Sequence, residues 1–213
     1  MGPDEPKNDR LRASYDAVAE PYAETFGDEL TQKPFDRALL ERFAAALPAA
    51  APVADVGCGP GQVARFLKGC GLEPLGLDLS PRTVTLARRR NPDLRFAVGD
   101  MRQLAFPDET FAGIVAFYAV IHLERAEVVG AFLEFYRVLK PGGRLLVSFH
   151  IGEGETGLET WFGRPVSLSF TFFRPAEMEA YLGEAGFTVL EALERPPYAF
   201  EVQTERLYVL AQK

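Results

Sequence analysis

The residues with the clearest chemical potential lie in one stretch, Asp55 to Gln62, which reads Asp-Val-Gly-Cys-Gly-Pro-Gly-Gln. Its three glycines, Gly57, Gly59 and Gly61, permit positive φ and let the backbone approach a ligand closely. Apolar residues before the turn predict a buried strand, and helical apolar spacing after it predicts a helix. The turn would therefore present free N–H groups at a helix N-terminus, where open α/β sheets bind nucleotide-like ligands.

The residues around this turn discriminate between ligands. A dinucleotide fingerprint has the spacing G-x-G-x-x-G, whereas this turn reads G-x-G-x-G and Gln62 stands in the place of the third glycine. The carboxylate of Asp55 would repel a pyrophosphate and attract a cationic amine. The turn therefore favours a ligand with an amine over a dinucleotide.

Acidic residues also end the next two predicted strands. Asp78 follows Gly57 by about 20 residues, the spacing at which a carboxylate accepts from both ribose hydroxyls. Asp100 could accept from an exocyclic amine while Met101 packs on the ring, or it could only cap its turn.

Apolar spacing along the rest of the chain predicts alternating helices and strands. This alternation indicates an α/β fold with a mainly parallel sheet, and two final strands without an intervening helix allow an antiparallel finish. We expect residues 1–7 to be disordered, Pro21 to interrupt the first helix, 151–157 to form a loop and Trp161–Phe173 to form an aromatic hairpin or arm. The predicted helices are Asn8–Glu20, Phe35–Leu47, Val63–Cys70, Pro81–Arg90, Glu124–Leu139 and Pro175–Ala185. The predicted strands are Val53–Val56, Glu73–Asp78, Leu94–Val98, Phe111–Phe117, Arg144–Phe149, Phe187–Leu193 and Arg206–Ala211.

A chain of 213 residues fits a single domain. The two helices before the first strand can fold over the carboxyl edge of the sheet as a lid, where Tyr15 and Tyr22 either face the site or only pack. We divide the domain into an N-terminal helical lid (1–48), a cofactor-binding core (49–150), an aromatic substrate arm (151–175) and a C-terminal helix with a strand pair (176–213).

Composition argues against several partners. The formal charge of -7 and a pI near 5.0 give no general attraction to nucleic acid or to an anionic membrane. The run Arg88-Arg89-Arg90 closes a predicted helix, where cations complement the helix dipole. Cys58 and Cys70 fit no disulfide or metal spacing, and no signal peptide is visible, so we expect a cytoplasmic protein.

Five motifs follow one another along the chain: Asp55–Gly61, Gly76-Leu-Asp78, Gly99-Asp100-Met101, Phe111–Phe117 and Leu139-Lys-Pro-Gly-Gly143. In this order they resemble the class I S-adenosylmethionine-dependent methyltransferases, and most of all the small-molecule branch that includes ubiquinone and menaquinone biosynthesis. The resemblance implies a Rossmann-like, seven-stranded sheet with an antiparallel last strand and helices on both faces. It also implies S-adenosyl-L-methionine as cofactor and S-adenosyl-L-homocysteine as product.

The resemblance further assigns roles to individual residues. The three glycines would approach the methionine portion and the ribose of the cofactor. Asp55 would bind the amino group, directly or through a neighbour, and Asp78 would bind the ribose hydroxyls. Asp100 would receive the adenine amino group and Met101 would flank the ring. The full set of expected cofactor-binding residues is Tyr15, Tyr22, Asp55, Gly57, Cys58, Gly59, Gly61, Asp78, Leu79, Asp100, Met101, Phe117, Tyr118 and His122.

The expected reaction is metal-independent, in-line transfer of a methyl group to a small acceptor, because a sulfonium methyl is already electrophilic. His122 and His150 are the candidate general bases, each weighed against a purely structural role. The aromatic residues Trp161, Phe162, Phe170, Phe172 and Phe173 either line a pocket for an apolar or aromatic acceptor or form a dimer contact, so the chain is a monomer or a homodimer. Two alternatives stay open: a non-catalytic S-adenosylmethionine-binding protein and, disfavoured by Gln62, a nicotinamide-dependent oxidoreductase.

Overall fold

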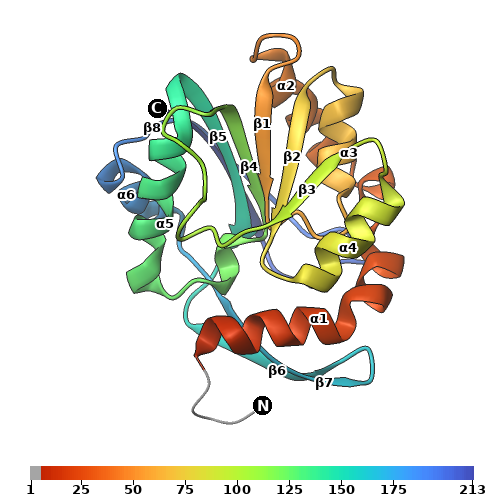
Figure 1. The fold of residues 1–213 in the computed structure, drawn as a ribbon. Helices are drawn as coiled ribbons and strands as arrows, with labels where there is room; N and C mark the ends of the chain where they lie inside the picture. Colours follow the sequence, from red (N-terminus) through yellow and green to blue (C-terminus); the bar gives the residue numbers. More distant parts are fainter. Residues whose placement is uncertain (1–5) are drawn as a thin grey trace.

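The carboxyl ends of parallel strands meet at one edge of a seven-stranded sheet, and this edge positions the site (Figure 1). In the computed structural model, which describes residues 6–213, the strands pair in the order β3-β2-β1-β4-β5-β9-β8. Strands β1 to β5 run parallel, and β9 runs antiparallel to both of its neighbours. The mainly parallel sheet with an antiparallel last strand is thus confirmed. The strands are β1 (Pro52–Val56), β2 (Glu73–Asp78), β3 (Arg95–Val98), β4 (Phe111–Phe117), β5 (Leu139–His150), β8 (Thr188–Arg195) and β9 (Arg206–Gln212).

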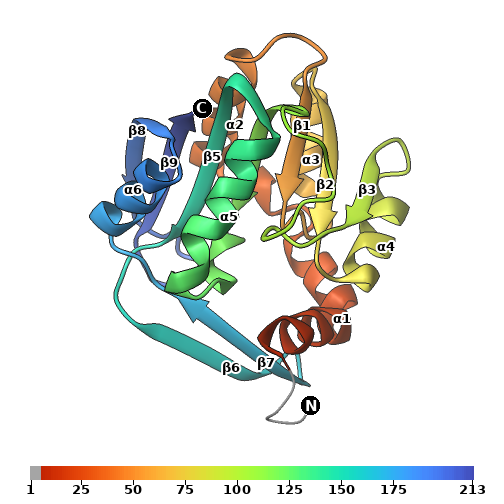
Figure 2. The same ribbon diagram turned by 60° about the vertical axis from the view of Figure 1, so that its left-hand side comes forward.

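Helices cover both faces of this sheet, as predicted (Figure 2). Neighbouring residues of one strand point to opposite faces, so Ile114 packs in the cluster that includes α5 and α6, while Val115 packs in the one that includes α2 and α3. The central strands are buried on both faces, which explains their continuous apolar sequences. The helices are α1 (Lys7–Phe26), η1 (Glu29–Gln32), α2 (Pro34–Ala45), α3 (Gln62–Gly69), α4 (Pro81–Arg90), η2 (Val120–His122), α5 (Arg125–Val138) and α6 (Pro175–Glu184).

Helix α1 lies across the carboxyl edge of the sheet, and a separate two-stranded hairpin lies alongside it in both views (Figures 1 and 2). The hairpin consists of β6 (Glu155–Trp161) and β7 (Arg164–Thr171). Of the two helices expected to form a lid, only α1 covers the edge. Helix α2 buries Leu40 and Phe43 in the cluster that packs on one face of the sheet, because its apolar residues recur on one side.

The expected break at Pro21 is wrong, because α1 continues through it to Phe26. A proline has no N–H, so the carbonyl of Ala17, four residues earlier, lacks its helical donor. The guanidinium of Arg164, from the start of β7, donates to this carbonyl oxygen at 2.6 Å. A residue distant in sequence thus replaces the missing hydrogen bond and ties the hairpin to α1.

Further boundaries differ from expectation. Strand β5 begins at Leu139 instead of Arg144, so the residues expected to end the preceding helix belong to the strand. The segment 151–157, predicted as a loop, contains the start of β6 at Glu155, which pairs with Thr171. The expected aromatic hairpin therefore exists but begins earlier. Disorder was expected for residues 1–7, of which 1–5 lie outside the described residues. The expectation is wrong for Lys7, because α1 begins there.

Candidate functional site

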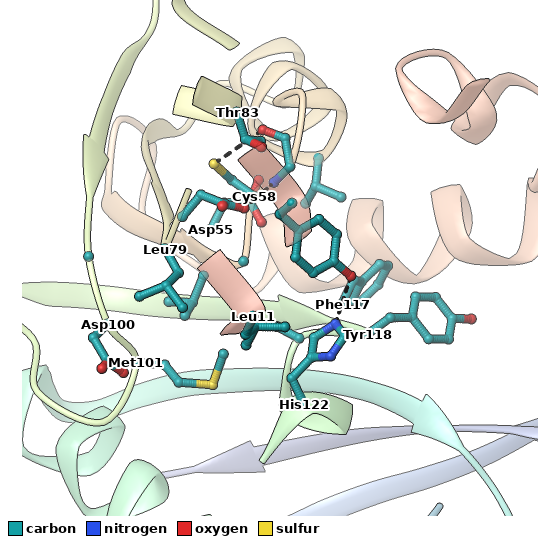
Figure 3. Close-up of a pocket in the computed structure, with 18 of the residues that line it drawn as sticks. Leu11, Asp55, Cys58, Leu79, Thr83, Asp100, Met101, Phe117, Tyr118 and His122 are labelled. Carbon is teal, nitrogen blue, oxygen red and sulfur yellow. Dashed lines mark hydrogen bonds between the residues drawn. The ribbon is translucent and has the colours of Figure 1, made fainter. Parts of the chain in front are cut away.

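A pocket lies at the carboxyl edge of the sheet, between the glycine turn and α1 (Figure 3). Of the fourteen expected cofactor-binding residues, every one except Gly61 lines it. Asp55 and Cys58 lie on one side, and Asp100 and Met101 on another (Figure 3). None of the described residues that line this pocket is a lysine or an arginine.

The three glycines of the turn have positive φ, but they face different neighbours. A Cβ on Gly57 would come within 2.5 Å of the Ala119 Cβ, and one on Gly61 within 2.7 Å of the Phe96 ring. A Cβ on Gly59 would meet only the Tyr22 ring at 3.4 Å and Gln62 Oε1 at 4.0 Å, both pocket-lining residues. Gly59 therefore leaves room in the pocket, whereas Gly61 permits packing behind it.

The carboxylate of Asp78 joins the end of β2 to the glycine turn. Its Oδ2 accepts a hydrogen bond from the Gly59 N–H at 3.0 Å, and its Oδ1 accepts from the Ser80 N–H at 2.9 Å. Burial raises the pKa of Asp78 to about 6, against the lowering effect of these two donors. The side chain is thus held by backbone and still lines the pocket.

Asp55, at the end of β1, is more deeply buried. Its side chain accepts from the Ala64 N–H at 3.0 Å in the first turn of α3, and the residue is 1% exposed. Burial raises the pKa of Asp55 to about 7, well above the usual range of a carboxyl. A cationic ligand would favour its ionised form.

Asp100 has partners from two directions. It caps its turn by accepting from the Arg102 N–H at 3.0 Å, pairs with the Arg102 guanidinium, and accepts from Asn8 of α1 at 2.7 Å. The capping role considered for Asp100 is present, and the residue also lines the pocket.

His122, on η2, forms a hydrogen-bonded pair with Tyr15 of α1. The Nδ1 of His122 lies 3.1 Å from the Ser169 carbonyl oxygen, which can only accept, so Nδ1 carries the proton and Nε2 accepts from the Tyr15 hydroxyl at 2.8 Å. Burial lowers the pKa of His122 to about 4 and raises that of Tyr15 above its usual range. Both groups are therefore neutral at neutral pH, and both ring nitrogens are occupied.

His150 does not line the pocket. Its Nδ1 lies 2.7 Å from Thr204 Oγ1, and its ring packs 5.2 Å from the ring of Tyr118. Burial and the nearby Arg206 lower its pKa to about 4. Of the two candidate bases, only His122 is at the site.

Tyr118 closes β4 with an unusual backbone conformation. Its φ is 53°, in the left-handed region. The side chain points away from His122 and Leu11 (Figure 3), and its hydroxyl lies 2.8 Å from that of Tyr208. Tyr118 therefore belongs to the pocket wall, while its phenol contacts Tyr208.

The aromatic arm packs on the lid helix. The Trp161 ring lies 5.4 Å from the Tyr22 ring and 6.2 Å from the Tyr15 ring, and Phe170 lies 5.2 Å from His122. Within the chain, these aromatics hold α1 over the pocket. Only Phe162 of this group is an exposed large apolar side chain, at 37%.

Several pocket residues had not been singled out as ligand contacts. They come from α1, from η1, from the starts of α3 and α4, from the ends of β1 and β3 and from the two residues that flank η2, and the tertiary fold brings them together. Gln62 replaces the third glycine of a dinucleotide fingerprint, and its side chain lines the pocket. The residues are Asn8, Leu11, Glu29, Val56, Gln62, Val63, Thr83, Gly99, Ala119 and Leu123.

Within residues 6–213, no cluster of three or more histidine, cysteine, aspartate or glutamate residues is arranged to hold a metal ion. No described helix is long and apolar enough to cross a membrane. Cys58 is buried in the glycine turn and Cys70 is partly exposed, both as free thiols. Burial raises the pKa of the Cys58 thiol well above its usual range.

Comparison with known proteins finds similarity to methyltransferases. Residues 53–143 match the family model described as a methyltransferase domain. The chain is 37% identical over 100 residues to a demethylmenaquinone methyltransferase of Tropheryma whipplei (strain Twist), covering 45% of this chain and 40% of that protein. It is 32% identical over 148 residues to a probable S-adenosylmethionine-dependent methyltransferase of Mycolicibacterium smegmatis, covering 66% of this chain and 53% of that protein. The chain thus spans about half or less of the length of these curated relatives.

A solved structure of comparable fold comes from Methanosarcina mazei and is described as an S-adenosylmethionine-dependent methyltransferase. It superimposes with a TM-score of 0.72 at 18% identity and covers 79% of this chain and 95% of that one. At this identity the likeness concerns the fold.

Proposed function

We propose that this protein transfers a methyl group from S-adenosyl-L-methionine to a small-molecule acceptor, since residues 53–143 match the family model described as a methyltransferase domain. The observation that carries the proposal is the charge of the pocket. Asp55, Asp78 and Glu29 line it, and none of its described lining residues is a lysine or an arginine. Such a pocket suits a nucleoside with a sulfonium and an ammonium group and disfavours a diphosphate.

The residues present fit this cofactor. Asp78 would accept from the ribose hydroxyls, Asp100 from the adenine amino group and Asp55 from the amino-acid end. The space beside Gly59 is kept open by the absence of a side chain. Two buried side-chain oxygens at the pocket, Gln62 Oε1 and Thr83 Oγ1, have no hydrogen-bond partner, which is typical of a site built for a polar ligand.

When bound, the cofactor supplies an electrophilic methyl group, so the chain has to align the acceptor and keep water out. Helix α1 covers the pocket and contributes Leu11 and Tyr15 to its wall. The neutral Tyr15–His122 pair fixes the position of the phenol, and we assign it a positioning role. We do not assign His122 or His150 as general bases, because both nitrogens of His122 are occupied and His150 lies outside the pocket.

The acceptor that we propose is small and largely apolar or aromatic. The pocket wall includes Leu11, Phe117 and Leu123, which offer apolar surface. The demethylmenaquinone methyltransferase among the relatives carries a name that fits such an acceptor.

Calorimetry with S-adenosylhomocysteine and with NADH is the direct test of the cofactor. We expect S-adenosylhomocysteine to bind and NADH not to bind. The reverse result would establish an oxidoreductase-type site and reject the proposal. Transfer of a labelled methyl group to a panel of quinol, phenol, carboxylic acid and thiol acceptors then tests turnover. Tight cofactor binding without turnover on the panel would favour the non-catalytic alternative.

A further inference from the structure

The amide oxygen of Gln62 is buried without a partner. The residue is 8% exposed, and its Oε1 makes no hydrogen bond. The amide nitrogen Nε2 donates to Glu29 Oε1 at 3.1 Å. Because a carboxylate only accepts, this bond fixes which end of the amide faces Glu29 and leaves the oxygen free.

This free oxygen lies at the glycine turn. Gln62 lines the pocket, and its Oε1 lies 4.0 Å from the position that a Cβ on Gly59 would take. The same position is 3.4 Å from the Tyr22 ring. The oxygen therefore faces the space that the absent side chain of Gly59 leaves open.

The surroundings of this oxygen are rich in acceptors. Glu29, from η1, lines the pocket with its carboxylate, and Lys33 holds the other carboxylate oxygen at 2.6 Å. Lys33 is itself paired with Glu201 at 3.0 Å and does not line the pocket. The acceptors Gln62 Oε1 and Glu29 line the pocket while Lys33 stays behind them, so this part of the wall suits a group with several N–H donors, such as a primary ammonium.

We propose that Gln62 Oε1, supported by Glu29, accepts a hydrogen bond from the primary ammonium of the cofactor's amino-acid end and so selects nucleosides that carry this ammonium. The inference rests on the proposed function and deepens it. It also explains the residue at the third glycine position: a side chain replaces the glycine because it binds the ligand.

Two ligands that differ only in the ammonium test the inference by calorimetry. They are S-adenosylhomocysteine and its analogue with hydrogen in place of the amino group. In Gln62→Met, which keeps length and removes the acceptor, we expect affinity for S-adenosylhomocysteine to fall roughly 10- to 100-fold, the usual range for a hydrogen bond to a charged group. Affinity for the desamino analogue should stay nearly unchanged.

Thr83→Val is the matched control, because it removes the other unpartnered buried oxygen of the pocket, on α4. It should leave the ratio of the two affinities as it is in the unsubstituted protein. Glu29→Gln provides a second route if Gln62→Met does not fold, as judged by circular dichroism. Its affinity for S-adenosylhomocysteine should fall by less than in Gln62→Met, and its affinity for the desamino analogue should again stay nearly unchanged.

The inference would be overturned if Gln62→Met lost affinity equally for both ligands. If only Glu29→Gln folds, an equal loss in that variant has the same meaning. Gln62 would then be a residue that only shapes the turn. If the unsubstituted protein binds neither ligand, the proposed function fails first and the inference fails with it. The two failures are therefore distinguishable.

Discussion

The hydroxyl of Tyr15 donates to Nε2 of His122 at 2.8 Å, and this bond joins α1 to the segment that follows β4. Tyr15→Phe would leave the buried nitrogen without a donor. We expect the free energy of unfolding to fall by about 1–3 kcal/mol, the usual cost of a buried unsatisfied polar group. Urea denaturation measures this loss. The control is Tyr136→Phe, because no hydrogen bond is described for the Tyr136 hydroxyl, and this substitution should leave the free energy of unfolding nearly unchanged. An equally small change in Tyr15→Phe would mean that water replaces the phenol.

Cofactor affinity should rise with pH. Burial raises the pKa of Asp55 to about 7 and that of Asp78 to about 6, and an ammonium and two hydroxyl donors would favour both ionised forms. Binding of S-adenosylhomocysteine should therefore release protons between about pH 5.5 and 7.5. Calorimetry in buffers with different ionisation enthalpies measures this release. Proton uptake, or no exchange at all, would contradict the assignment.

The same two carboxyls have the opposite influence on the stability of the free protein. Their folded-state pKa values lie above the unfolded value near 3.8, so the folded chain holds protons that the unfolded chain has released. Their contribution to the free energy of unfolding therefore falls as pH rises from about 4 to about 7. In Asp55→Asn, this pH-dependent loss should be smaller than in the unsubstituted protein.

Two glycines of the turn should respond differently to alanine. Both have positive φ, so each substitution carries a backbone cost of about 1–2 kcal/mol. In Gly59→Ala the methyl group enters the pocket, and we expect a large loss of S-adenosylhomocysteine affinity. In Gly61→Ala the methyl group would meet Phe96 at 2.7 Å, so we expect a larger loss of stability. Paired calorimetry and denaturation separate the two effects, and a reversed pattern would remove Gly59 from the ligand site.

Arg164 and Pro21 should be energetically coupled. Arg164 donates to the Ala17 carbonyl that Pro21 leaves without a helical donor. We expect Arg164→Met to lower the free energy of unfolding by about 0.5–1.5 kcal/mol. In the Pro21→Ala background the same substitution should have a smaller effect, because the alanine N–H can bond to the Ala17 carbonyl. A double-mutant cycle by urea denaturation measures the difference. Equal losses in both backgrounds would show that the guanidinium acts elsewhere.

Local patterns predicted most of the fold. The spans Phe111–Phe117 and Glu73–Asp78 correspond to β4 and β2, because a continuous apolar run between turn residues is typical of a buried parallel strand. The strand β6 was missed at its start, since Glu155 and its neighbours are exposed and carry no apolar alternation. Its pairing with β7 stabilises it instead.

The site was less predictable where its contacts join distant parts of the chain. The carboxyl edge gathered Asp55, Asp78 and Asp100 as the alternation of strands predicted. The partner of His122, however, lies on α1, 107 residues earlier. No spacing rule connects such residues. Glu29, on a short 3-10 helix, also reaches the pocket without any periodic signal in the sequence.

The unequal burial of the two thiols determines where alkylating reagents can reach the chain. Cys58 is enclosed in the glycine turn with a protonated sulfur, whereas Cys70 is partly exposed. A fluorophore or nitroxide reagent should therefore label Cys70 in the native state without prior mutagenesis. Modification of Cys58 would then mark only those molecules in which the turn itself has opened.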